Sequence, residues 1–499
     1  MTMSATASIA SSSSVRPVLS HPSAPSLWAA TAPAAPPTPP LAAPLTTTDV
    51  LVIGAGYTGL SAALHLAESG ASVCVLDAHA PGWGASGRNG GQVNPTLKYD
   101  PDELQRIHGA ARGERLIDAV SRSADLVYGL IERHGIDCAP VRAGWLQVGY
   151  TQQAVDGMHA RARQWERRGV RVELLDRAAT AARTGTPAFA GGWLDGRAGA
   201  IQPLAYVRGL VRAAQALGVQ VHSESPVLAL ERQGTDHWVA TTAQGHRIQA
   251  RQVLLGTNGY TDGLWPSLAR TVLAANSFIV ATQPLGKAGA HILPGGETGS
   301  TSQRLLLYFR KDAQGRLLMG GRGHFADPQG AGDYAHLERA VALMFPGLGP
   351  LQYEYRWAGR IAVTRDFMPH LHQPAPGITM ALGYNGRGIA MATLLGREAA
   401  ALMAGGNALA CSFPVTPVQP IPLHGLQRLY IAAGVAWYSL LDRLGREVQW
   451  GRLIKPRRPR ASAAAPAAPR ARRTRAPSPG RPAASRRPRH PRPIAPWHR

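Results

Sequence analysis

The chain is poor in cysteine and has no long hydrophobic run. Its 499 residues include only Cys74, Cys138 and Cys411, which are far apart and odd in number. This spacing excludes a disulfide framework and a CxxC metal or redox pair, so we expect a protein of the reducing cytoplasm. The apolar stretch Leu429–Leu441 spans thirteen residues, whereas a membrane-spanning helix needs about twenty. It predicts a buried or surface-docked helix.

Acidic residues are missing from both ends of the chain. Residues 1–45 contain a single base, Arg16, and are rich in proline. They lack the positive start and continuous apolar core of a signal peptide, so we expect a disordered Pro-rich arm. Residues 452–499 carry fifteen of the Lys and Arg residues, which leaves +8 of the net charge of +23 for the rest of the chain.

This basic Arg/Pro/Ala tail has no apolar periodicity, so we expect it to be disordered. Its charge could bind RNA, DNA or anionic lipid. No aromatic residue is interleaved before Trp497, so base stacking has no support. The alternative is a solvated tail with no specific role.

A glycine-rich turn follows the first apolar strand. Val50–Ile53 has the profile of a buried parallel strand, and Gly54, Gly56 and Gly59 follow it as GxGxxG before a helical repeat of apolar residues. Such glycines allow a tight turn, close approach of the backbone to a pyrophosphate and close packing of helix on strand. Asp77 ends the next apolar strand, where it can accept hydrogen bonds from ribose hydroxyls. The order of these features predicts a bound dinucleotide.

A second glycine-rich segment, GWGASGRNGGQ, begins five residues after Asp77. It has five glycines among its first ten residues, so backbone N–H groups can close on a large flat ring system and its phosphates. In a nicotinamide dehydrogenase the chain usually continues here into another helix. The segment therefore favours a different dinucleotide.

These two motifs resemble the FAD-dependent D-amino-acid-oxidase superfamily, which includes glycine and sarcosine oxidases. SLWAATAPAAPPTPPL and GWGASGRNGGQVNP resemble, more narrowly, its gamma-glutamylputrescine oxidoreductase branch, and the likeness covers about residues 26–450. The resemblance suggests that the Pro-rich segment is an arm that wraps the domain. Sarcosine oxidases of the family attach FAD through a cysteine in the segment equivalent to RIAVT. This chain has no cysteine there, so we expect non-covalent FAD.

The resemblance implies an α/β fold with a Rossmann-like FAD-binding domain and a mixed-sheet substrate domain, both discontinuous in sequence. The FAD-binding domain is expected over residues 46–100, 196–262 and 355–412, the substrate domain over 101–195 and 263–354, and a C-terminal helical extension over 413–451. The residues expected to bind FAD are Gly54, Gly56, Gly59, Asp77, Gly84, Ser86, Gly87, Arg88, Asn89, Gly90, Gly91, Gln92, Val227, Thr257, Gly359, Gly383, Asn385, Gly386 and Gly388.

The resemblance also implies a reaction. A carbon that bears an amine gives a hydride to the flavin, and water hydrolyses the resulting imine to a carbonyl compound. We expect gamma-glutamylputrescine or a related primary amine as substrate, hence polyamine catabolism, with O2 as acceptor and H2O2 as product. The alternatives are a glycine, sarcosine or D-amino-acid oxidase or dehydrogenase and, in another class, a flavoprotein that acts through RNA or membrane binding by its basic tail.

Three side chains are expected to position the substrate, and no metal is expected. Tyr308 and Arg310 alternate on one strand and so share a face, and Tyr384 stands among the last glycines. His370 and His372 form an HxH pair, for which no third ligand is apparent.

Overall fold

The computed structural model describes residues 26–303, 306–323, 326–433 and 437. The chain divides into two compact units, Met1–Trp450 and Gly451–Arg499, and all described residues belong to the first. The basic tail predicted for residues 452–499 therefore lies outside the described residues. So does the part of the predicted arm before residue 26.

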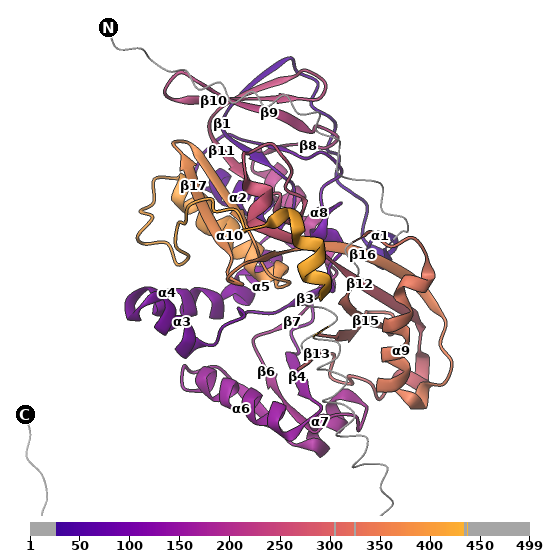
Figure 1. The fold of residues 1–499 in the computed structure, drawn as a ribbon. Helices are drawn as coiled ribbons and strands as arrows, with labels where there is room; N and C mark the ends of the chain where they lie inside the picture. Colours follow the sequence, from indigo (N-terminus) through magenta and orange to yellow (C-terminus); the bar gives the residue numbers. More distant parts are fainter. Residues whose placement is uncertain (1–25, 304–305, 324–325, 434–436, 438–499) are drawn as a thin grey trace, which may run out of the picture. The chain divides into compact units, whose positions relative to one another are not determined.

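The first of two eight-stranded sheets carries the predicted dinucleotide motif (Figure 1). Its central strand β1 runs parallel to β11 on one side and to β2 on the other, with Ile53 beside Leu255 and Leu76. The carboxyl ends of the three strands therefore meet at one edge. In order the strands are β17 (His370–Ala375), β18 (Ile378–Leu382), β11 (Arg247–Leu255), β1 (Leu45–Ile53), β2 (Val73–Leu76) and β8 (Gln220–His222), with β10 (His237–Thr242) and β9 (Val227–Gln233) attached to β11.

Three helices pack together beside this sheet because their small and aliphatic residues form a continuous core. They are α2 (Tyr57–Glu68), α8 (Pro203–Ala216) and α10 (Gly388–Met403). Gly396 of α10 allows the closest approach, since a Cβ there would lie 2.5 Å from the carbonyl oxygen of Thr58 in α2. Helix α5 (Ser123–Arg133) packs on α10, and α3 (Pro101–His108) and α4 (Ala110–Ser121) precede it. The predicted Rossmann-like α/β fold is confirmed.

The second sheet is mixed, as predicted. All its neighbouring strands are antiparallel except β13 and β4. Its strands are β16 (Tyr353–Thr364), β12 (Val272–Pro284), β15 (Arg316–Arg322), β14 (Tyr308–Lys311), β13 (Thr298–Thr301), β4 (Trp145–Gly149), β6 (Gly191–Asp195) and β5 (Val172–Leu175). Residues 355–364, which the sequence groups with the FAD-binding segments, pair with β12 in this sheet.

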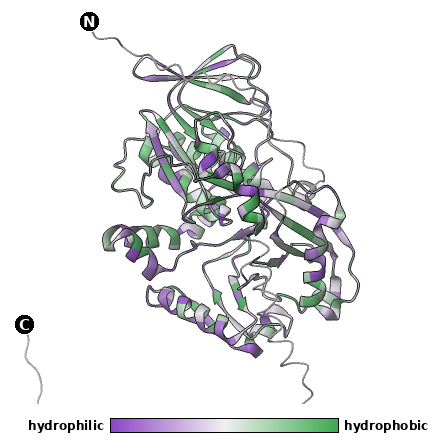
Figure 2. Cartoon of the chain, viewed as in Figure 1, coloured by the Kyte–Doolittle hydropathy of each residue, from purple (hydrophilic) through white to green (hydrophobic). Residues whose placement is uncertain are grey.

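Helices cover the second sheet on both of its faces. Helix α6 (Gln152–Glu166) places Val155, Met158, Ala162 and Trp165 at helical spacing against β4 and β6, while the rest of its surface is hydrophilic (Figure 2). Helix α7 (Arg177–Thr184) packs on β6, and α9 (Ala335–Met344) packs on β15 beside a core of Phe278, Phe309 and Met319. The remaining described strands, β3 (Gln92–Val93) and β7 (Gly199–Ala200), form a small antiparallel pair.

The Pro-rich arm is ordered from residue 26 onward. Helix α1 (Leu27–Thr31) buries Trp28, whose indole N–H donates to the carbonyl oxygen of Asn89 at 2.7 Å. Further along, Leu41 N donates to Ser225 Oγ at 2.9 Å. Carbonyl oxygens between these points accept hydrogen bonds from Arg208, Gln215 and His222. The expectation of disorder therefore does not hold for residues 26–44, which wrap the first sheet's layer as the resemblance suggested.

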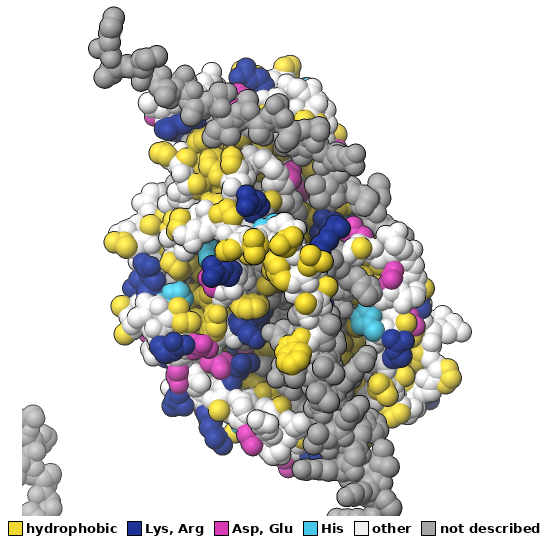
Figure 3. Space-filling model, in the orientation of Figure 1, with side chains coloured by type: hydrophobic (Ala, Val, Ile, Leu, Met, Phe, Trp, Pro, Cys, Tyr) yellow, Lys and Arg dark blue, Asp and Glu magenta, His cyan; other side chains and the backbone are white. Residues whose placement is uncertain are grey.

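The described part of the C-terminal extension exposes apolar side chains. Residues 427–433 are helical, and Leu429 is 71% exposed and Trp437 58% exposed. Figure 3 shows hydrophobic side chains, in yellow, over this part of the surface. Of the two predicted alternatives, a buried or a surface-docked helix, the exposure of Leu429 excludes the buried one at this residue. Among the described residues, no helix combines the length and the apolar character that crossing a membrane requires.

Candidate active site

A cleft lies at the edge where β1, β2 and β11 end. Its empty volume is about 1320 Å³, a figure that includes the space open at its mouth. It is lined by residues that follow these strands and by residues from the glycine loop (Gly82–Gln92), β16 and the start of α10. Both glycine-rich segments of the sequence therefore border one cleft.

The GxGxxG turn forms one wall of the cleft. Gly54 has φ of +108°, a conformation that favours glycine. A Cβ on Gly59 would lie 1.9 Å from the carbonyl oxygen of Gly54, so only glycine lets α2 approach β1 so closely. Helix α2 begins at Tyr57, and its N-terminal N–H groups face the cleft, where they can bind phosphate. Ser86 Oγ accepts from Tyr57 N at 3.1 Å.

Asp77 lines the cleft beside the GxGxxG turn. Its carboxylate accepts from Ala55 N at 2.6 Å and from His79 N at 2.9 Å. Burial raises its pKa to about 6, although both hydrogen bonds oppose the rise. Ser225 and Val227 line the cleft beside it. A buried carboxylate held by two backbone N–H groups is suited to accept further hydrogen bonds from ribose hydroxyls.

The glycine loop is folded on itself by Asn89. Its side-chain amide donates to the carbonyl oxygens of Ala85 and Ser86 at 3.1 and 2.9 Å, and its Oδ1 accepts from Gly91 N at 2.8 Å. The hydroxyl of Tyr57 donates to Ser86 O at 2.6 Å. Asn89 thus fixes the backbone shape of the glycine loop.

The second sheet holds the glycine loop from behind. Arg310 is buried, and its Nη1 donates to the carbonyl oxygens of Gly91 and Ile201, both at 2.8 Å. A Cβ on Gly90 would lie 2.5 Å from the ring of Tyr308, so the loop rests directly on that ring. The hydroxyl of Tyr308 hydrogen-bonds Ser277 Oγ at 2.9 Å.

Two tryptophans fix the middle of the loop. Trp357 Nε1 donates to Arg88 O at 2.9 Å, and Trp28 Nε1 donates to the next carbonyl, that of Asn89. Their rings meet edge to face with centroids 5.9 Å apart. Arg88 Nε in turn donates to Ala358 O at 2.5 Å. The N-terminal arm and β16 therefore clamp two successive peptide groups of the loop.

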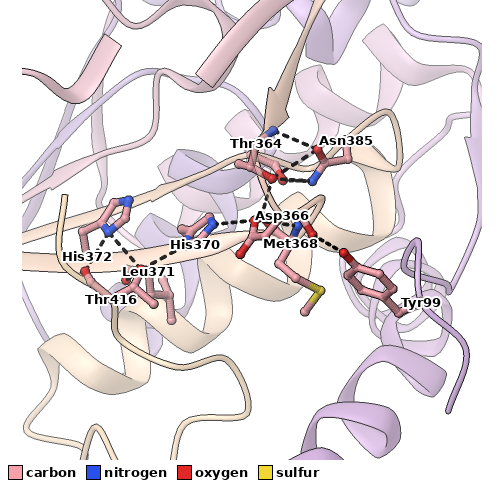
Figure 4. Close-up of polar contacts among 10 residues, drawn as sticks. Tyr99, Thr364, Asp366, Met368, His370, Leu371, His372, Asn385 and Thr416 are labelled. Carbon is pink, nitrogen blue, oxygen red and sulfur yellow. Dashed lines mark hydrogen bonds and ion pairs between the residues drawn. The ribbon is translucent and has the colours of Figure 1, made fainter. Parts of the chain in front are cut away.

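The segment before α10 closes the cleft (Figure 4). Asn385 has a positive φ of 52°, its Oδ1 accepts from Thr364 N at 3.0 Å, and its Nδ2 donates to Gly383 O at 2.6 Å. Gly383 N donates to Asn258 Oδ1 at 2.9 Å, which ties this segment to the end of β11. Tyr384 is buried, and its hydroxyl lies 2.5 Å from Thr58 Oγ1 on α2.

The predicted site residues fall into two groups. Those that line the cleft are Gly54, Gly56, Asp77, Gly84, Ser86, Asn89, Val227, Thr257, Tyr384, Asn385, Gly386 and Gly388. Those that support its walls without lining it are Gly59, Gly87, Arg88, Gly90, Gly91, Gln92, Tyr308, Arg310, Gly359 and Gly383. Their individual roles toward cofactor and substrate stay predictions.

Aromatic residues that the sequence did not single out also line the cleft. Trp83 stacks on His79 with ring centroids 4.0 Å apart and meets Tyr260 edge-on at 5.5 Å. Asn258 and Asp262 follow β11 at the same edge. Their signal was present, because TNGYTD continues directly from the strand that ends at Leu255.

The two histidines of the HxH pair lie on β17, away from this cleft (Figure 4). His370 Nε2 lies 3.0 Å from Asp366 Oδ1, and burial lowers the pKa of His372 to about 4. Within the part of the chain that the structure describes, no group of three or more His, Cys, Asp or Glu side chains could hold a metal ion.

Comparison with known proteins decides which dinucleotide enzyme this is. Residues 49–402 match the model of the DAO family, described as FAD dependent oxidoreductase. The chain belongs to this family. It is 33% identical over 407 residues to the gamma-glutamylputrescine oxidoreductase of Escherichia coli (strain K12), an alignment that covers 80% of this chain and 94% of that protein. It is also 33% identical to a probable oxidoreductase, OrdL, of Rhizobium meliloti (strain 1021), over 79% and 92% of the two chains.

Solved structures share the fold. Glycine oxidase of Geobacillus kaustophilus has a TM-score of 0.64 and 21% identity, with 74% of this chain and 99% of that chain covered. L-proline dehydrogenase of P. horikoshii has a TM-score of 0.61 and 19% identity, with coverage of 73% and 96%.

The DAO-family chain is an FAD-dependent oxidoreductase, and its cleft fits FAD. Gly54 and Gly56 line the cleft without side chains, and Tyr57 and Thr58 at the N-terminus of α2 line it next to them, where a pyrophosphate can bind. Asp77 supplies acceptors for a ribose, and Trp83 and Tyr260 supply apolar walls. The predicted family and cofactor are thereby confirmed.

Proposed function

We propose that this enzyme oxidises the carbon–nitrogen bond of an amine, with gamma-glutamylputrescine or a related primary amine as substrate. The observation that supports the proposal is the 33% identity with a gamma-glutamylputrescine oxidoreductase, which extends over 80% of the chain. The free, buried cysteines support a place in the reducing cytoplasm. O2 is the proposed electron acceptor.

The chemistry is divided between cofactor and protein. When bound, FAD accepts a hydride from the carbon that bears the amine and passes the electrons on to O2. The amine becomes an imine, which water hydrolyses to an aldehyde and ammonia. An alkylamine with a pKa near that of lysine, about 10.4, is neutral in only about one molecule in a thousand at pH 7.4, and only the neutral form has the lone pair that expels hydride. Burial and positive charge near the amine favour that form.

The chain's own residues orient the partners. The clamps on Arg88 and Asn89 fix the glycine loop, and Arg310 and Tyr308 hold it from the second sheet. We propose that these side chains set the position of the flavin ring and so act on the substrate indirectly. Tyr384 lines the cleft, so it is our candidate for direct substrate contact.

Turnover of an amine panel tests this function. We expect the purified holoenzyme to release H2O2 and ammonia with gamma-glutamylputrescine, and to release much less with sarcosine, glycine or D-alanine. Turnover of the small amino acids alone would replace the proposal by the amino-acid oxidase alternative. Flavin reduction without H2O2 formation would indicate a dehydrogenase.

A further inference from the structure

Positively charged side chains lie beside the FAD cleft, near the start of α10 and the segment that follows the glycine loop. Arg387 stands between Gly386 and Gly388, which both line the cleft. Its Nε donates to Thr96 Oγ1 at 3.1 Å, and Thr96 follows the glycine loop along the chain. The guanidinium of Arg387 thus lies beside the cleft, between the start of α10 and the segment around Thr96 that follows β3.

Two further cations face Arg387. Lys98 lies two residues after Thr96 in the irregular segment that follows β3, and Arg161 comes from α6. Burial and the charges of Arg387 and Arg161 lower the pKa of Lys98. Burial and the charge of Arg161 lower the pKa of Arg387 to about 10. The geometry agrees, because the hydrogen bond of Arg387 to Thr96 and the ion pair of Arg161 with Asp100 hold both guanidinium groups against residues 96–100. Lys98 belongs to the same segment and is exposed.

Nearby acids do not neutralise this group, which we call the basic cluster (Lys98, Arg161 and Arg387). Asp100 Oδ1 lies 2.5 Å from Arg161 Nε. Glu103 also faces Lys98 but is paired with Arg106 at 3.2 Å. Among these groups, three cations therefore face a single unshared carboxylate. An anion is the ligand that such a site favours.

Unpaired hydrogen-bond donors adjoin the basic cluster. Gln147 is 7% exposed, and its Oε1 accepts from Arg161 Nη1 at 3.4 Å. Its Nε2 has no hydrogen-bond partner among the described residues. The same holds for Nε1 of Trp193, which pairs with Gln147 in register across β4 and β6. A buried donor left without an acceptor destabilises the folded state, so an acceptor is expected beside these side chains.

The position of the basic cluster outside the cleft indicates what kind of substrate could reach both. Lys98, Arg161 and Gln147 are not among the residues that line the cleft. A substrate whose amine carbon lies at the flavin must therefore extend out of the cleft to reach them. Its distal end must offer acceptor atoms and negative charge.

We propose that Lys98, Arg161, Arg387 and Gln147 bind a carboxylate at the end of the substrate remote from the amine. This inference rests on the proposed amine oxidation and narrows its substrate class to extended amines that carry a distal carboxylate. Gamma-glutamylputrescine has this chemistry, whereas putrescine, which lacks the carboxylate, does not.

The test compares these two amines in variants of the holoenzyme. For Arg161→Gln we expect KM for gamma-glutamylputrescine to rise at least about tenfold, the loss of a charge-assisted hydrogen bond. We expect kcat and the KM for putrescine to stay within about twofold of the wild type. Lys98→Gln should act in the same direction without touching the Asp100 ion pair. Arg163 is an exposed residue of the same helix, and Arg163→Gln should leave KM and kcat unchanged for both amines.

A carboxylate that cannot be oxidised separates this inference from the proposed function. Glutarate should perturb the flavin absorbance of the wild type and of Arg163→Gln, but not that of Arg161→Gln. If no amine reduces the flavin and glutarate still shows this pattern, the proposed function fails and the carboxylate site stands. If gamma-glutamylputrescine is turned over but Arg161→Gln and Lys98→Gln raise KM for both amines equally, or for neither, the carboxylate site is wrong.

Discussion

The two sheets contribute to the active site in different ways. The first sheet presents mainly backbone to the cleft, because Gly54, Gly256 and the N-terminus of α2 follow its strands, and Asp77 adds one carboxylate. The second sheet contributes side chains, such as Arg310 and Tyr308 behind the glycine loop and Gln147 beside the basic cluster. A cofactor shared by a whole family can be held by backbone, whereas a substrate that distinguishes one member requires side chains.

The largest effect is expected from adding one methyl group to the wall of the cleft that the GxGxxG turn forms. Gly59→Ala would place a Cβ 1.9 Å from Gly54 O, so α2 must move away from β1. We expect loss of soluble, FAD-loaded protein, measured by yield and flavin absorbance. Gly129→Ala is the matched control, because a Cβ there meets nothing within 4 Å. Its α5 should gain up to about 1 kcal/mol. Equal behaviour of the two variants would contradict the account.

The next largest effect is expected where the second sheet holds the loop. Arg310→Met removes two charge-assisted hydrogen bonds to the carbonyl oxygens of Gly91 and Ile201. Since such bonds contribute about 1.5–3 kcal/mol each, we expect the dissociation constant of FAD to rise at least about tenfold, measured by titration of the apoprotein. Lys311→Met, on the opposite face of β14, is the control. Unchanged FAD affinity in Arg310→Met would show that the loop is held by the first sheet alone.

The pH dependence of FAD binding tests the contribution of Asp77, which follows β2 of the first sheet. The pKa of Asp77 is raised to about 6 by burial, so the carboxylate is ionised at neutral pH and takes up a proton as the pH falls through about 6. We expect FAD affinity to fall in that range, since a protonated carboxyl accepts ribose hydroxyls less well. In the apoprotein the folded state binds more protons than the unfolded state between about pH 4 and 6, so stability decreases as the pH rises through this window.

Asp77→Asn provides the check on this assignment. The pH dependence of FAD affinity near pH 6 should disappear in this variant, and its affinity should be lower at neutral pH. Persistence of the wild-type pH profile in Asp77→Asn would place the titrating group elsewhere.

A smaller effect is expected from the arm. Trp28→Phe keeps the aromatic packing against Trp357 but removes the hydrogen bond to Asn89 O. The loss of about 1 kcal/mol predicts an approximately fivefold weaker FAD affinity. Trp265→Phe, at a site remote from the loop, is the control. If the two variants bind FAD equally, the arm covers the domain without positioning the loop.

The smallest effect is expected from deleting residues 452–499, the predicted basic tail. We predict unchanged amine turnover and FAD content. Salt-sensitive binding of RNA or anionic vesicles that the full chain shows and the truncated chain lacks would instead support the class of function that depends on the tail.

The difference between the two sheets also explains which parts of the site the sequence could predict. Gly54, Gly56, Gly59 and Asp77 lie within about thirty residues of one another, and local rules of strand, turn and helix bring them together. The basic cluster joins residues 98, 161 and 387, which are far apart in the sequence and which only the tertiary fold brings together. No spacing in the sequence predicts such a group.

The roles of individual residues were also harder to predict than their positions in the fold. Arg310 and Tyr308 were expected at the substrate because their alternation puts them on one face of β14, and they do share a face. That face meets Gly90 and Gly91 of the glycine loop, a contact between distant segments that no local pattern encodes. Trp28 was missed for the same reason, since a Pro-rich, acid-free segment carries the composition of a disordered arm.

The most direct test of the central claim is an anaerobic titration of the purified holoenzyme with gamma-glutamylputrescine, followed by flavin absorbance. Our account predicts stoichiometric bleaching of the flavin bands, and their return when O2 is admitted. A protein that binds no flavin even with added FAD, or a bound flavin that neither this amine nor any of the small amino acids bleaches, would contradict it.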